Sequence, residues 1–259
     1  MSDLKTRAHA LIPPFLSRRA AGMFFAISRE DIARQLAERI DTPGKIKQHA
    51  PSLCGRTALL YRIAYSNPVM YARFAIDLYE RGRAMLEGLN IKPGAHVRRS
   101  CAKPGMPALD WMMLESLRGS RNWFLVYQRA TRLNPGLTPP IEMLQCFRRA
   151  GYRWVFNDTG AFAFRDMSSA RSANSFFRRN YRVCLLINSN IIKGQQGQIS
   201  FSPDQWLVLA SEIRMHSNTV SFDVFTKSGR RDALRVPRLT EENFVANYYG
   251  FIACSDSLR

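Results

Sequence analysis

Between residues 28 and 151, apolar side chains recur at every third or fourth position, which is the spacing of helices with one buried face. The segments that follow this pattern are 28–42, 57–66, 67–82, 110–118 and 138–151. The first begins with the capping pair Ser28 and Asp31 and is stopped by Thr42-Pro43-Gly44. We expect the core to receive an apolar stripe from three of these helices: Ile32, Leu36 and Ile40, then Tyr71, Phe74, Leu78 and Tyr79, and finally Ile141, Leu144 and Phe147.

After residue 151 the pattern changes to short β-rich runs bounded by turn residues. Strands are predicted at 153–156, 182–187, 206–213 and 220–226, followed by a short helix capped by Thr240 and an edge strand at 250–253. Helices that precede an antiparallel sheet are typical of an α+β fold. The expected organisation is a basic N-terminal segment at 1–27 and a single domain at 28–259, with a helical part to about 151 and a β-rich part from about 152.

The composition of the chain narrows its class. With 259 residues, of which 46% are hydrophobic, the chain can bury a sizeable core. It contains no apolar run of the length that spans a membrane, and its first residues do not resemble a signal peptide, so we expect a cytoplasmic location in the producing cell. The five cysteines lack a paired spacing, which argues against a disulfide framework and a zinc site. We expect neither a metal nor another cofactor.

The formal net charge of +18 indicates either a solvated basic surface or a partner of opposite charge. The positive residues are scattered in short clusters rather than one tract: Arg18-Arg19, Arg98-Arg99, Arg148-Arg149, Arg178-Arg179 and Arg230-Arg231. No helix-turn-helix, zinc-finger or RNP pattern accompanies them. A protein partner or peptide substrate is therefore favoured, and nucleic acid or an anionic surface stays an alternative.

The strongest candidate for chemistry is Cys54, at the start of the helix predicted for 57–66. The free N–H groups and the dipole of a helix N-terminus stabilise a thiolate and make the sulfur a nucleophile. Gln48 lies six positions upstream and could donate to the oxyanion of a tetrahedral intermediate, and Gly55 follows the cysteine directly. The alternative is that Cys54 is an inert, buried residue.

The spacing of Gln48, Cys54 and Gly55 resembles papain-like cysteine peptidases. Over most of the chain from about residue 40, the similarity is to papain-like domains of bacterial toxins delivered by contractile secretion systems. The segments that carry this wider resemblance are 53–60, 67–71, 78–82, 110–118 and 247–251. The resemblance implies a helix bearing the cysteine packed on a C-terminal antiparallel sheet, cleavage of a peptide or amide bond, and delivery into another cell without a signal peptide.

The same resemblance implies a catalytic histidine at the start of the strand 206–213 and an orienting residue near the end of the strand 220–226. Gln205 occupies the place expected for the base, and Thr226, followed by Lys227, lies near the place of the orienting residue. Glutamine does not titrate near neutrality, so it can neither take the thiol proton nor return it. The part of the papain-like pattern that supplies the base and its orienting residue is thus altered.

None of the four histidines is an evident replacement. His216 is predicted in the turn after the strand 206–213, more than about 20 Å from its start at 3.3 Å per residue. His49 adjoins Gln48, but a neighbouring loop position rarely has the geometry of a base. His9 and His96 are expected at the surface.

Three functions therefore remain open. The first is an active cysteine hydrolase of the effector type, with Cys54 as nucleophile and an unidentified base. The second is a catalytically degenerate papain-like module that captures a protein partner. The third is a basic binder of nucleic acid or an anionic surface, in which Cys54 is structural.

Overall fold

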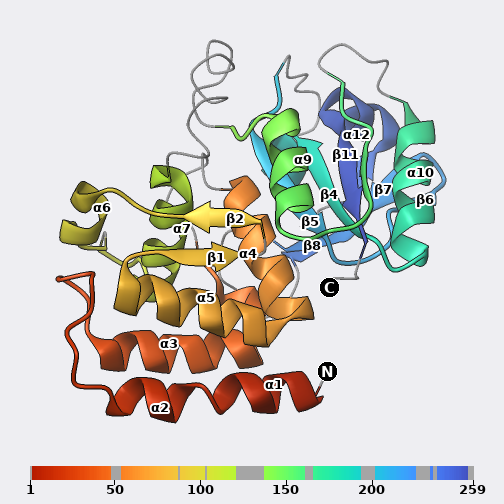
Figure 1. Cartoon of the computed structure of the whole chain (residues 1–259). Coiled ribbons are helices and arrows are strands. Elements are labelled where there is room, and N and C mark those ends of the chain that lie inside the picture. Colours follow the sequence, from red (N-terminus) through yellow and green to blue (C-terminus); the bar gives the residue numbers. More distant parts are fainter. Residues whose placement is uncertain are drawn as a thin grey trace.

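The computed structural model describes residues 2–47, 54–86, 88–102, 104–120, 137–160, 166–193, 202–225, 234–235 and 238–255. In these residues the chain has an α+β fold with antiparallel sheets, as the sequence predicts (Figure 1). None of the described helices combines the length and apolarity needed to cross a membrane.

The first half of the chain is mainly helical. Its elements are α1 (Ser2–His9), α2 (Ile12–Ser17), α3 (Arg29–Asp41), the short 3-10 helix η1 (Pro43–Lys45), α4 (Cys54–Ser66), α5 (Pro68–Arg81), β1 (Ala84–Leu86), β2 (Leu89–Ile91), α6 (Ala95–Arg99), α7 (Ala108–Gly119) and α9 (Pro140–Arg149). In Figure 1, α1, α2 and α3 form the outer layer below α5.

The cap predicted for α3 is confirmed, and α5 is capped at both ends. At α3 the Ser28 side chain accepts a hydrogen bond from the backbone of Asp31. At α5 the Asn67 side chain accepts from Met70, and the helix ends at Gly82, whose φ of 61° is the left-handed conformation that glycine adopts at low cost. The apolar stripes predicted for both helices are buried.

The helix α9 buries part of the face that its sequence pattern predicts. Leu144 and Phe147 are buried as expected, but Ile141 is 49% exposed, and Glu142, Met143 and Cys146 are buried as well. The pattern of apolar residues does not predict the burial of Glu142, because a carboxylate is normally expected at the surface.

The second half of the chain builds the sheets. Its elements are β3 (Val155–Asn157), α10 (Met167–Arg178), β4 (Arg182–Ile187), α11 (Asn190–Lys193), β5 (Gln205–Leu209), β6 (Arg214–His216), β7 (Thr219–Ser221), β8 (Asp223–Phe225), β9 (Leu234–Arg235), β10 (Leu239–Thr240), α12 (Glu241–Ala246) and β11 (Tyr248–Cys254). Among the described residues, the main sheet has six antiparallel strands in the order β3-β11-β4-β5-β8-β9. A smaller sheet has the order β10-β7-β6.

Three of the predicted strands differ in the structure. The strand predicted for 220–226 is divided into β7, in the smaller sheet, and β8, in the main sheet. The strand predicted for 206–213 ends at Leu209, and 214–216 pairs in the smaller sheet instead. The physical reason is Asn174 of α10, whose buried side chain donates to the backbone O of Ile213 at 2.7 Å and accepts from its N–H at 2.8 Å. The strand predicted at the edge, 250–253, is part of β11, which lies between β3 and β4 with all seven residues buried.

Each face of the main sheet carries its own hydrophobic core. Along β5, Trp206 and Val208 belong to the larger core, shared with α4, α5 and α9, while Leu207 and Leu209 belong to a second core with α10 and α12. Figure 1 shows α9 and α10 on opposite sides of the sheet. This alternation is the two-residue period of a β-strand, and it fixes which strand residues can face α4.

The N-terminal residues join the larger core. The sequence sets 1–27 apart as a basic segment, but Ala8, Phe15 and Phe24 are at most 1% exposed and pack in the same core as α3 and α5. The side chain of Arg29 also donates to the backbone O of Phe15 and of Ala20. These residues are an integral part of the helical half.

Candidate functional site

The helix that was predicted to carry the nucleophile begins at Cys54 itself. It is 13 residues long, it contacts β5 of the main sheet, and its residues 55–60 are all buried. The prediction of a buried central helix with the cysteine at its N-terminus is confirmed at the level of the backbone. A helix of this length presents free N–H groups at its first turn.

Gly55 lies where α9 meets the first turn of α4. A Cβ atom at this position would be 2.9 Å from the Thr138 Oγ1 and 3.0 Å from the Met143 sulfur. Glycine therefore follows the cysteine because the segment leading into α9 leaves no room for a side chain.

Thr138 also ties the start of β5 to this place. Its backbone O accepts a hydrogen bond from the indole Nε1 of Trp206 at 2.9 Å, and Trp206 is 3% exposed. The first turn of α4 and the start of β5 thus both lie next to Thr138.

Gln205 lies at the start of β5, but its side chain does not face α4. It pairs with Ile187 of β4, and both Ile187 and Leu207 belong to the core on the α10 side of the sheet. Alternation along the strand places Gln205 on that side as well, opposite to Trp206. The structure therefore brings Gln205 to the expected end of the sheet and turns its side chain to the other face.

The other residues considered for the site either lie outside the described residues or lie elsewhere in the fold. Gln48, His49 and Thr226 lie outside the described residues. The remaining histidines are elsewhere: His9 bonds to the Asp41 carboxylate at 2.8 Å, and His96 and His216 are exposed on α6 and β6.

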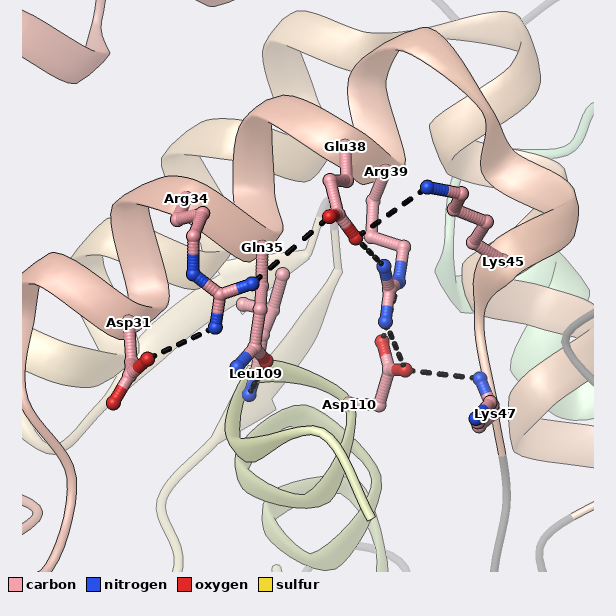
Figure 2. A network of polar contacts seen from close by, with 9 residues as sticks. All are labelled: Asp31, Arg34, Gln35, Glu38, Arg39, Lys45, Lys47, Leu109 and Asp110. Atoms are coloured by element: carbon pink, nitrogen blue, oxygen red, sulfur yellow. Dashed lines mark hydrogen bonds and ion pairs between the residues drawn. The ribbon is translucent and has the colours of Figure 1, made fainter. Parts of the chain in front are cut away.

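A buried ion pair fixes the chain just before the segment 48–53 (Figure 2). Arg39 of α3 donates to both carboxylate oxygens of Asp110 of α7, at 3.2 and 2.8 Å, and the two side chains are 3% and 0% exposed. The backbone N–H of Lys47 donates to the same carboxylate at 2.9 Å. Burial raises the pKa of Asp110, and the bonds from Arg39 oppose that shift. Asp110 is therefore an anchor for the residue that precedes Gln48.

Sequence reasoning missed a carboxyl group beside the first turn of α4. Glu142 of α9 is 3% exposed, and neither of its carboxylate oxygens has a hydrogen-bond partner among the described residues. Burial raises the pKa of Glu142, and the positive charge of Arg56 of α4 opposes this. The only sequence signal is an acidic residue in the first turn of a helix, which is common at exposed positions too.

Three other cysteines are buried thiols without nucleophilic character. Burial raises the pKa of Cys146 well above its ordinary value and that of Cys254 to about 12. Cys184 is likewise buried, whereas Cys101 is exposed. A protonated, inaccessible thiol does not attack a carbonyl. In the part of the chain that the structure describes, no cluster of His, Cys, Asp and Glu could hold a metal ion.

The chain matches no protein-family model, and no curated protein or solved structure is significantly similar to it. Its function must therefore be inferred from the geometry and chemistry of its own residues.

Proposed function

We propose that this chain is a papain-like cysteine hydrolase of the effector type, which attacks a peptide or amide bond through Cys54. The observation that carries the proposal is the meeting of the α4 N-terminus with the start of β5 at Thr138. It supports a thiol presented at a helix N-terminus beside the sheet end from which such enzymes draw their catalytic groups. Delivery into another cell rests only on the sequence resemblance.

In this proposal the Cys54 thiolate adds to the carbonyl carbon of the substrate, and the carbonyl oxygen becomes an oxyanion. The N–H groups of the first turn of α4 stabilise the thiolate, and Gln48 donates to the oxyanion. Collapse of the intermediate breaks the C–N bond and forms a thioester, and the leaving amine takes up a proton. Water then hydrolyses the thioester and regenerates the thiol.

The scheme needs a proton donor for the leaving amine, and we assign this role to Glu142. A carboxyl group whose pKa is raised keeps its proton to a higher pH than an ordinary glutamate, which suits a general acid. Glu142 lies beside Arg56 in the first turn of α4, and its neighbour Met143 lies beside Gly55. Its oxygens make no hydrogen bond to the described residues that would occupy them.

A second candidate function is a non-catalytic binding module with the same architecture. The observation that favours it is the orientation of Gln205, since even a histidine at that position would face the α10 side of the sheet. In this alternative Cys54 needs no activation.

Thiol labelling separates the two functions within one molecule. The exposed Cys101 is an internal reference, and the buried Cys146, Cys184 and Cys254 are protected in the folded chain. If the chain is a hydrolase, iodoacetamide should modify Cys54 faster than Cys101 at pH 6 to 7, as peptide mass spectrometry would show. A rate for Cys54 equal to or below that of Cys101 would favour the binding module.

A peptide library then tests cleavage directly. New amino termini should appear with the unaltered chain and disappear with Cys54→Ser, while Cys101→Ser should leave the cleavage unchanged. Glu142→Gln should lower the rate and shift the alkaline side of the pH profile, because it removes a titrating acid. Cleavage that survives Cys54→Ser would contradict the proposal.

A further inference from the structure

The turn between α9 and β3 combines positive charge with an exposed aromatic ring. Residues 148–154, named here the Arg-Trp turn, contain Arg148, Arg149, Arg153 and Trp154. The three arginines are exposed, and 60% of Trp154 is accessible. Single exposed apolar side chains are common on protein surfaces, so this ring is informative only if further rings or charges lie beside it.

The backbone of the Arg-Trp turn is held firmly. Gly151 has a φ of 86°, its N–H donates to the Arg148 O, and the Tyr152 N–H donates to the Phe147 O at 3.1 Å. These two bonds form a Schellman motif, and the Tyr152 and Phe147 rings supply its apolar contact with centroids 5.3 Å apart. The Trp154 O then accepts from the N–H of Ser255, which follows β11. Hydrogen bonds thus fix the backbone that carries Trp154.

A second exposed ring lies on the strand that follows. Trp154 directly precedes β3, an edge strand of the main sheet, and Phe156, 42% exposed, is the second residue of β3. The hydrogen bond from Ser255 continues the pairing of β3 with β11 back to Trp154, and residues two apart in extended chain share a face and lie about 6.6 Å from each other. Phe156 is itself supported by Phe176 of α10, with the ring centroids 4.7 Å apart. The edge therefore offers two neighbouring aromatic surfaces.

The arginines of the Arg-Trp turn are available to a partner. Arg148, Arg149 and Arg153 form no ion pair with the described residues, whereas Arg178 of α10 is neutralised by Glu212 at 2.8 Å. The guanidinium carbon of Arg153 lies 5.9 Å from the Trp154 ring centre, a cation–π arrangement that positions charge next to the aromatic face. The surface thus matches a ligand that carries both anionic groups and flat rings.

We infer that the Arg-Trp turn and Phe156 bind single-stranded nucleic acid, with bases stacked on the two rings and phosphates held by the arginines. Unpaired bases stack on aromatic side chains, and a positively charged surface follows the backbone. A duplex hides its bases and would use only the charges. This binding site is separate from Cys54, so it does not depend on the proposed hydrolase activity.

Fluorescence anisotropy of a labelled single strand of about 16 nucleotides, as oligothymidine and as oligouridine, tests the role of the rings. Trp154→Ala should weaken binding by about 5- to 150-fold, because one stacked base is lost, while Trp154→Phe should retain most of the affinity. Phe25→Ala is the matched control, since Phe25 is 71% exposed between α2 and α3. Equal affinities for the Trp154→Ala and Phe25→Ala variants would overturn the inference.

Salt dependence tests the arginines. Replacement of Arg148, Arg149 and Arg153 by alanine should reduce the slope of log affinity against log salt by about 2, at about 0.7 for each lost phosphate contact on a single strand. Arg73→Ala, at another exposed arginine without an ion pair among the described residues, is the control for charge alone. An equal slope in the triple variant and in Arg73→Ala would overturn the assignment.

Two further measurements exclude other ligands. The single strand should quench the tryptophan fluorescence of the unaltered chain, and Trp154→Phe should lose most of that quenching. Vesicles with anionic lipid should bind no more strongly to the unaltered chain than to Trp154→Ala. Trp154-dependent vesicle binding without oligonucleotide binding would assign the surface to a membrane instead.

Discussion

At the scale of single residues, burial rather than sequence spacing determines which polar groups matter around α4. Glu142 of α9 is buried and makes no hydrogen bond to the described residues, so its charged form is disfavoured. Gln205, by contrast, occupies the expected position in sequence but the opposite face of the sheet. Whether a side chain can act near α4 therefore depends on the face of the helix or strand that it occupies.

The raised pKa of Glu142 predicts how stability depends on pH. An unfolded glutamate titrates at about 4.3. The folded state holds the proton more firmly, so the free energy of unfolding should decline as the pH rises from about 4.3 to the folded pKa. Glu142→Gln should remove this decline. Urea denaturation of both chains over a series of pH values measures it, and parallel curves would show that Glu142 does not titrate abnormally.

At the scale of elements, polar side chains join helices that the sequence predicts only one by one. Asp110 of α7 binds Arg39 of α3, and the Gln35 side chain of α3 accepts from the Leu109 N–H at the start of α7 at 2.8 Å (Figure 2). The cap residue of α7, Pro107, supplies no side-chain bond of its own. The network therefore replaces a missing cap and orders Lys47 before the segment that leads to Cys54.

Asp110→Asn should be strongly destabilising for this reason. It removes the buried partner of the Arg39 guanidinium, which is 3% exposed, and leaves only the half-exposed Glu38 carboxylate beside it; breaking a buried pair costs about 3–5 kcal/mol. Arg34→Ala breaks an ion pair in the same network, but the Arg34 side chain is 62% exposed, so it should cost less than about 1 kcal/mol. Urea unfolding of the two variants measures the difference, and equal losses would contradict the role given to burial.

What the sequence predicts well is decided by local chemistry. The cap at Ser28 and the bounds of the helix predicted for 67–82 depend on neighbours within a few positions, and they are found as expected. The end of β5 depends on Asn174, which is 39 positions from Ile213, and the exposure of Ile141 depends on how α9 packs. Of the candidate site, the start of α4 at Cys54 was predictable, but Glu142 and the face of Gln205 were not, because they follow from tertiary packing.

At the scale of the whole molecule, the main sheet joins two hydrophobic cores. Alternate residues of β4, β5 and β11 contribute to the core with α4 and to the core with α10. A side chain lost from either core therefore weakens support for the same strands. The N-terminal helices belong to the first of these cores, although the sequence suggests a separate segment.

The pair Phe15 and Phe25 tests this last point. Phe15 of α2 is 1% exposed and contacts Tyr79 of α5, whereas Phe25 is 71% exposed. Phe15→Ala should lower the free energy of unfolding by about 3–5 kcal/mol, because it removes a large ring from the core and leaves a cavity. Phe25→Ala should change it by less than about 0.5 kcal/mol. Thermal and urea unfolding of both variants measure the difference. If residues 1–27 were a separate segment, the two substitutions would have the same small effect; a large loss for Phe15→Ala alone would show that the fold that presents Cys54 begins in α1 and α2.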